Sequence, residues 1–158
     1  PIKLFYEAKY YLTSKELKFQ NSEPLEQYLS EYPDSPFLTD ALNQLLGYFK
    51  INKLAEKEIE YFNTYIDKLS DDPWFLNQFA WRMTELNQNL SLALDKVNIA
   101  LSLMNEEAQG VANIIDTKAE VLWKLGKIDE AIQIIEKAIM LDPTNIYYQE
   151  QKTKFETN

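Results

Sequence analysis

The spacing of small residues within residues 113–145 constrains the fold more than any other feature of this 158-residue chain. Alanines alternate there with large apolar residues, a Leu125-Gly126 pair interrupts the pattern, and Asp142-Pro143 ends it. Glycine permits the left-handed backbone that often ends a helix, and proline cannot continue a helix. The segment therefore predicts two helices joined by a tight turn and packed closely through alanines. These alanines are Ala119, Ala131 and Ala138.

The same segment resembles the tetratricopeptide repeat (TPR), a helix–turn–helix unit of roughly 34 residues. Such a unit buries its apolar face only against neighbouring units, so the resemblance implies further repeats. A second copy places Ala80, Ala93 and Ala100 at the small positions, with a slightly longer turn of Asn and Gln between its helices. Towards the N-terminus only the helical spacing of apolar residues persists, which indicates degenerate repeats.

We predict an all-α fold, an α-α superhelix of TPR-like helical hairpins with a C-terminal capping helix. No segment shows the alternation that is typical of a strand. One helical repeat domain is expected to span residues 1–158. Its expected parts are a degenerate N-terminal hairpin at 1–33, a degenerate repeat at 36–70, a repeat at 73–105, the clearest repeat at 112–145 and the capping helix at 146–156. The cap is expected to shield the end of the last repeat.

The residues that are absent limit the chemistry. The chain has no Cys and no His, which removes disulfides, thiol nucleophiles, histidine bases and the usual zinc sites. The acidic pairs Asp71-Asp72 and Glu106-Glu107 lack the spacing of a calcium loop and are expected at helix starts. We therefore predict no enzymatic activity, no cofactor and no metal. The net charge of −9 disfavours nucleic acid, and no apolar run is long enough for membrane insertion.

The resemblance implies a concave face lined by the first helix of each hairpin, where a peptide or protein partner would bind. Tryptophan is frequent at such interfaces because it offers a large rigid surface. The alternative is that the tryptophans fill the spaces between hairpins. Acidic groove positions disfavour a partner with a terminal carboxylate. The candidate partner-binding residues are Asn43, Lys50, Trp74, Asn77, Trp81, Asp116, Glu120 and Trp123.

The predicted function is a non-catalytic protein–protein interaction scaffold whose partner the sequence does not identify. Residues 76–85, 114–126 and 147–155 also resemble the C-terminal helical module of some bacterial thioredoxin-like proteins, which implies a docking tail behind a redox domain. A third alternative is a structural or oligomerisation module, in which the tyrosines of the N-terminal hairpin contact another domain or copy. Those tyrosines are Tyr6, Tyr10, Tyr11, Tyr28 and Tyr32. A first residue of Pro1 suggests part of a longer chain, and the compartment is undetermined.

Overall fold

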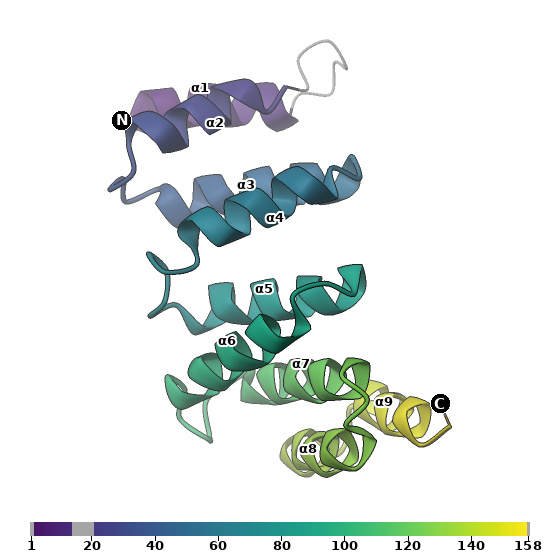
Figure 1. Cartoon of the computed structure of the whole chain (residues 1–158). Coiled ribbons are helices and arrows are strands. Elements are labelled where there is room, and N and C mark those ends of the chain that lie inside the picture. The colour runs from purple at the N-terminus through teal and green to yellow at the C-terminus, as the bar shows by residue number, and fades with distance from the viewer. Residues whose placement is uncertain (1, 14–20, 158) are drawn as a thin grey trace. The chain divides into compact units, whose positions relative to one another are not determined.

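A computed structural model describes residues 2–13 and 21–157, with side chains described outside 11–13 (Figure 1). All regular secondary structure in the described part of the chain is α-helical. The contacts of the chain form two compact units, residues 1–64 and 65–158, and each unit is treated by itself. The helices are α1 (Ile2–Thr13), α2 (Glu23–Glu31), α3 (Leu38–Ile51), α4 (Ala55–Tyr65), α5 (Pro73–Leu86), α6 (Leu90–Ser102), α7 (Val111–Lys124), α8 (Ile128–Leu141) and α9 (Ile146–Thr157).

The N-terminal unit has an aromatic core. Phe5 of α1 is almost fully buried, and its ring stacks on Phe37 with centroids 5.0 Å apart. The hydroxyl groups of Tyr28 and Ser35 share a hydrogen bond of 2.6 Å, which ties α2 to the turn before α3. Large rings thus fill this hairpin, where the small-residue pattern of the later repeats is missing.

The tyrosines of the N-terminal hairpin divide between the core and the surface. Tyr28 is buried and Tyr32 is half-buried, whereas Tyr6 and Tyr10 are each 59% exposed. The side chain of Tyr11 lies outside the described residues. Some of these tyrosines therefore pack the hairpin, and others are largely exposed to solvent.

Local sequence sets the helix ends of the C-terminal unit. Asp72 caps α5, where its carboxylate accepts hydrogen bonds from the backbone N–H groups of Trp74 and Phe75 at 2.9 and 3.1 Å, which agrees with the expected helix start. The α5–α6 turn uses Asn87 and Asn89 in the left-handed region, with φ of 52° and 50°. Asparagine tolerates this backbone better than other side chains apart from glycine.

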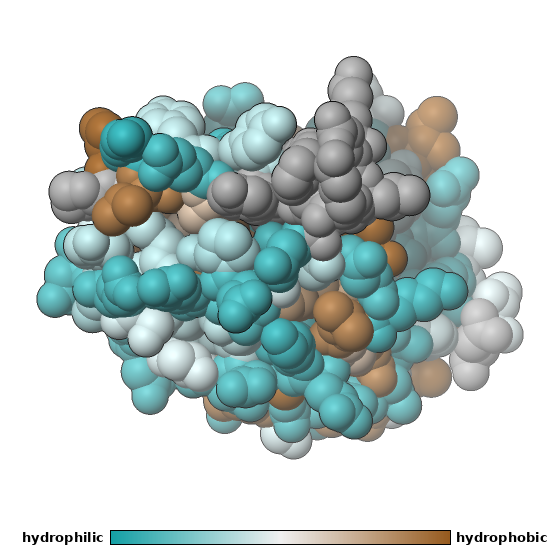
Figure 2. Space-filling model, turned by 90° about the horizontal axis from the view of Figure 1, so that it is seen from above, coloured by the Kyte–Doolittle hydropathy of each residue, from teal (hydrophilic) through white to brown (hydrophobic). Residues whose placement is uncertain are grey.

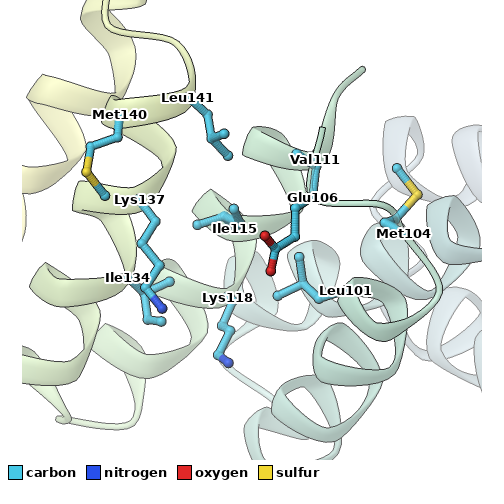
Figure 3. Close-up of a pocket in the computed structure, with 10 residues that line it drawn as sticks. All are labelled: Leu101, Met104, Glu106, Val111, Ile115, Lys118, Ile134, Lys137, Met140 and Leu141. Carbon is cyan, nitrogen blue, oxygen red and sulfur yellow. The ribbon is translucent and has the colours of Figure 1, made fainter. Parts of the chain in front are cut away.

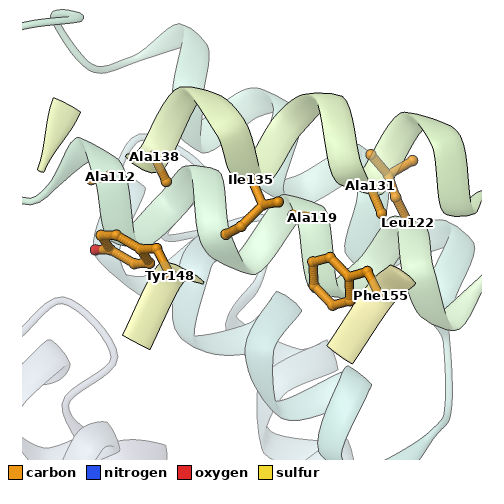
Figure 4. Close-up of a cluster of buried hydrophobic side chains, with 8 residues drawn as sticks. All are labelled: Ala112, Ala119, Leu122, Ala131, Ile135, Ala138, Tyr148 and Phe155. Atoms are coloured by element: carbon orange, nitrogen blue, oxygen red, sulfur yellow. The ribbon is translucent and has the colours of Figure 1, made fainter. Parts of the chain in front are cut away.

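Close packing of α7 on α8 depends on the predicted alanines (Figure 4). Ala119, Ala131 and Ala138 are fully buried, together with Ile135. Two aromatic residues of α9, Tyr148 and Phe155, complete the cluster (Figure 4). The absence of larger side chains at the three alanines allows the two helix backbones to approach closely.

Hydrophilic side chains predominate on the face seen in Figure 2, with hydrophobic groups scattered among them. No helix in residues 2–13 or 21–157 is both long and apolar enough to cross a membrane. The predicted all-α class of helical hairpins followed by a C-terminal helix is confirmed. The secondary structure leaves open which surface could recognise a partner.

Candidate functional site

The predicted partner-binding residues lie on three helices. Asn43 and Lys50 are exposed on α3 in the N-terminal unit. The other six lie in the C-terminal unit, where α5 and α7 are in contact. Trp74, Asn77 and Trp81 are on α5, and Asp116, Glu120 and Trp123 are on α7. The two helices differ sharply in how much of these side chains solvent can reach.

On α7, the predicted acidic positions are covered by α9. Asp116 and Glu120 are each 5% exposed. The side-chain amide of Gln151 donates to Asp116 Oδ1 at 3.4 Å and to Glu120 Oε2 at 3.2 Å, and Lys154 Nζ donates to Glu120 Oε2 at 2.6 Å. These carboxylates therefore bind the chain's own C-terminal helix, which the sequence interpretation treated only as a polar cap.

Gln151 is the centre of this buried network. Its side-chain N–H₂ group lies 3.0 Å from the Tyr147 hydroxyl oxygen, in addition to the two carboxylates. An amide nitrogen has only two hydrogens, so it cannot satisfy all three acceptors at once. The Tyr147 hydroxyl in turn hydrogen-bonds Asp116, so the two carboxylates, the amide and the phenol form one connected network.

The electrostatics of Asp116 follow from this arrangement. Burial, with a smaller contribution from the negative charge of Glu120, raises the pKa of Asp116 to about 6, against the opposing effects of the hydrogen bonds from Gln151 and Tyr147 and of the Lys154 charge. The pKa of the Tyr147 hydroxyl is also raised, first by burial and then by the two carboxylates. The site therefore holds a carboxyl group that titrates near neutral pH.

Trp123 forms the apolar end of the α7–α9 contact. Its indole stacks on the Phe155 ring with centroids 5.7 Å apart, and Lys154 Nζ lies 4.5 Å from the indole centroid. The hydroxyl of Tyr148 donates to Asn113 Oδ1 at 2.6 Å at the other end of the helix. The α7 face thus binds α9 through an aromatic ring, an ammonium group, and amide and hydroxyl donors.

On α5 the predicted positions are more open. Trp74 is 47% exposed, while Asn77 and Trp81 are half-buried. The buried Asn77 Oδ1 atom has no hydrogen-bond partner among the described residues. An unsatisfied buried acceptor is costly, but this oxygen is not open to a partner's donor in the structure. The α5 face thus offers an exposed aromatic surface, and the Asn77 oxygen lies beneath it.

One expectation for the acidic pairs is wrong. Glu106 and Glu107 do not begin a helix, because α7 starts at Val111 and the two residues lie in the turn before it. The turn is held instead by Asn105, whose side-chain oxygen accepts a hydrogen bond from the Glu107 backbone N–H at 3.1 Å. No group of three or more His, Cys, Asp or Glu residues in the described ranges could hold a metal ion.

The tetratricopeptide repeat family model matches residues 112–145, which are α7, α8 and the turn after them. A search of curated proteins finds no match. Among solved structures, the chain is similar to the nearly identical TPR-like repeats of a proposed kinesin light chain from Podosopora anserina. The TM-score is 0.68 at 13% identity, over 98% of this chain and 84% of that chain.

These similarities show a repeat in one part of the chain and the fold of the whole. The chain contains a TPR repeat and has the fold of TPR-like helical repeat proteins. At 13% identity the structural likeness shows the fold alone. Repeats of this class typically serve as protein-interaction scaffolds and are generally not enzymes. The resemblance to thioredoxin-like proteins gains no support from these findings.

Proposed function

We propose that the chain is a non-catalytic scaffold that binds a peptide or a protein domain through the α5 part of its predicted concave face. The observation that carries the proposal is the α5 surface of Trp74, Asn77 and Trp81. It combines the 47% exposed indole of Trp74 with the half-buried side chains of Asn77 and Trp81. A rigid aromatic surface of this kind is typical of a protein-binding hot spot.

The corresponding face of α7 supports the proposal by analogy within the molecule. That face binds a helix, α9, through an aromatic stack on Trp123 and donors to Asp116 and Glu120. Because α9 already occupies these positions, we assign partner contact to α5 and give Asp116, Glu120 and Trp123 the role of holding α9. Asn43 and Lys50 remain predicted contacts of the N-terminal unit.

Site-specific photo-crosslinking tests the assignment. A photoreactive phenylalanine derivative at position 74 should yield discrete polypeptide adducts in lysate of the source cells. The same residue at position 98, which is exposed on α6, serves as the matched control. Trp81→Ala should remove the adducts formed at position 74 without changing the helical circular dichroism spectrum. Equal adducts at positions 74 and 98 would contradict the assignment.

A second candidate is self-association through α1. Ile2, Tyr6 and Tyr10 recur at helical spacing on this helix, and each is 59% exposed. Exposed apolar residues in a stripe are typical of a contact surface. Light scattering on the wild type and on Tyr6→Ser with Tyr10→Ser tests this candidate, because a dimer through α1 should become a monomer. A monomeric wild type at high concentration contradicts it.

A further inference from the structure

An apolar cleft of about 380 Å³ opens between the end of α6, the α6–α7 turn, α7 and α8 (Figure 3). Its apolar lining includes Leu101, Val111 and Ile115, and Met104 and Met140 lie at opposite sides (Figure 3). Met140 is 73% exposed at the rim. Methionine side chains are flexible and polarizable, so a cleft flanked by them can adapt to different apolar groups.

The cleft is separate from the surfaces discussed above. Its α7 residues, Val111, Ile115 and Lys118, recur at intervals of four and three. They therefore lie on one face of the helix, roughly opposite the face that carries Asp116 and Glu120. A ligand in this cleft would leave the contacts of α9 intact.

Two lysines make the cleft locally positive in a chain whose net charge is −9. Lys118 and Lys137 both line it, with their ammonium groups towards the same end (Figure 3). Neither makes an ion pair or side-chain hydrogen bond within the described part of the chain. The pKa of Lys118 is lowered, first by burial and then by the charge of Lys137, although Glu130 partly opposes this. An anionic group between the two ammonium groups would offset the desolvation cost of the Lys118 charge and the repulsion between the two lysines.

One acidic residue also lines the cleft. Glu106, in the α6–α7 turn, is the only acidic residue that lines the described cleft, and its carboxylate points into the cleft (Figure 3). The two ammonium groups would attract an acidic group of a bound segment and Glu106 would repel it, so the lysines determine where that group lies.

We propose that this cleft binds a segment of a partner polypeptide through a large apolar side chain and a neighbouring Asp or Glu whose carboxylate pairs with Lys118 and Lys137. The apolar side chain displaces water from Leu101, Val111 and Ile115. The open, Met-flanked rim admits a polypeptide backbone along the surface. The positive charge of the cleft is confined to two lysines in a chain of net charge −9, which suits a single carboxylate of a protein partner rather than an extended anionic membrane surface.

Peptide selection combined with methionine NMR tests the proposal. A random 12-residue peptide library is selected on the wild-type chain, and the best peptides are titrated against protein carrying ¹³C-methyl methionine. The chain has three methionines. Met104 and Met140 line the cleft, whereas Met83 is fully buried in α5 and serves as an internal reference. We expect enrichment of acidic and large apolar residues together, with shifts at Met104 and Met140 larger than at Met83.

Charge variants check the lysine pair. Lys118→Gln with Lys137→Gln should weaken the selected peptides at least tenfold. Lys124→Gln with Lys127→Gln makes the same charge change outside the cleft and should leave affinity within about twofold. Replacing the acidic residue of the peptide by its amide should cause the same loss of affinity for the wild-type chain. It should have little further effect on binding to the Lys118→Gln, Lys137→Gln variant.

Several results would overturn the proposal: no peptide selected, enrichment of basic peptides, or binding that leaves Met104 and Met140 unshifted. Decanoate is titrated as a separate probe, and binding as tight as that of the best peptide would assign the cleft to a fatty acid instead. Peptides that crosslink at position 74 but leave the cleft methionines unshifted would support the α5 surface alone. The two assignments can therefore fail independently.

Discussion

The Trp74 indole of α5 lies over Gly110, at the point where any other residue would carry a side chain. A Cβ atom on Gly110 would be 2.5 Å from Cη2 of the indole, and the residue has a φ of +85°. Glycine is therefore required at position 110 for two reasons: the backbone is left-handed there, and the indole ring occupies the space of a side chain. This contact joins the start of α5 to the turn before α7.

The three glycines form a graded test of that relationship. Gly110→Ala combines a clash with backbone strain, Gly126→Ala adds strain alone at φ +77°, and Gly47→Ala in α3 meets nothing within 4 Å. We expect Gly110→Ala to lower the free energy of unfolding by about 2–4 kcal/mol and Gly126→Ala to lower it by about 1 kcal/mol. Gly47→Ala should raise it by up to about 1 kcal/mol. Urea denaturation measures all three, and a loss for Gly126→Ala equal to that for Gly110→Ala would contradict the role of the indole.

Asp116 should make the stability of the chain depend on pH. Its folded pKa of about 6 exceeds the ordinary value of 3.8, so the folded state holds the proton more tightly. The contribution of this group to stability is greatest below pH 4 and is lost as the pH rises to about 6. Asp116→Asn should therefore stabilise the protein at pH 8, by up to about 3 kcal/mol, and change little at pH 3.5.

Thermal or urea denaturation across this pH range measures the effect. Asp95→Asn is the matched control, since Asp95 is exposed on α6. A parallel pH dependence for wild type and Asp116→Asn would show that Asp116 does not titrate in the folded state as proposed.

Lys154 should stabilise the α9 contact mainly by compensating the Glu120 charge. Lys154→Met keeps the length of the side chain but leaves a nearly buried carboxylate without its ammonium partner. We expect a loss of about 1–3 kcal/mol. Glu120→Gln in the same background should restore part of it, because an amide can remain buried without a counter-charge. A double-mutant cycle on unfolding free energies checks this, and strict additivity of the two changes would contradict the coupling.

Ala138 should tolerate no larger residue at the α7–α8 contact. Ala138→Leu places three more carbon atoms where the alanine is fully buried, and overpacking of this kind costs about 1–3 kcal/mol. Gln133→Leu makes an apolar change on the exposed side of the same helix and should be nearly neutral. Denaturation midpoints separate the two, and equal effects would show that the helices can move apart at no cost.

The hairpins of the C-terminal repeat could be predicted because their determinants are local. Gly126 follows the end of a helix both in the prediction and in the structure. Ala119, Ala131 and Ala138 are buried, as their spacing indicates. The candidate site was less accessible to prediction. Asp116 and Glu120 have the helical position of groove residues, but nothing near them in sequence shows that Gln151 and Lys154 cover them.

The cleft between α6, α7 and α8 gave no usable sequence signal. Its apolar residues have the same spacing as core residues, and Lys118 and Lys137 look like ordinary surface charges. They become a site only because three helices and a turn bring them together. The exposed Met140 likewise cannot be distinguished by sequence from the buried Met83.

The sequence by itself determined that the chain is helical, where its clearest repeat lies and which residues allow its helices to pack closely. These properties depend on backbone preferences and on a period of a few residues. The tertiary structure alone decided which predicted surface remains accessible, because α9 reaches residues of α7 that lie 31 to 35 positions earlier in the chain. Such long-range contacts depend on the sum of packing, burial and charge over several helices, which no local pattern encodes.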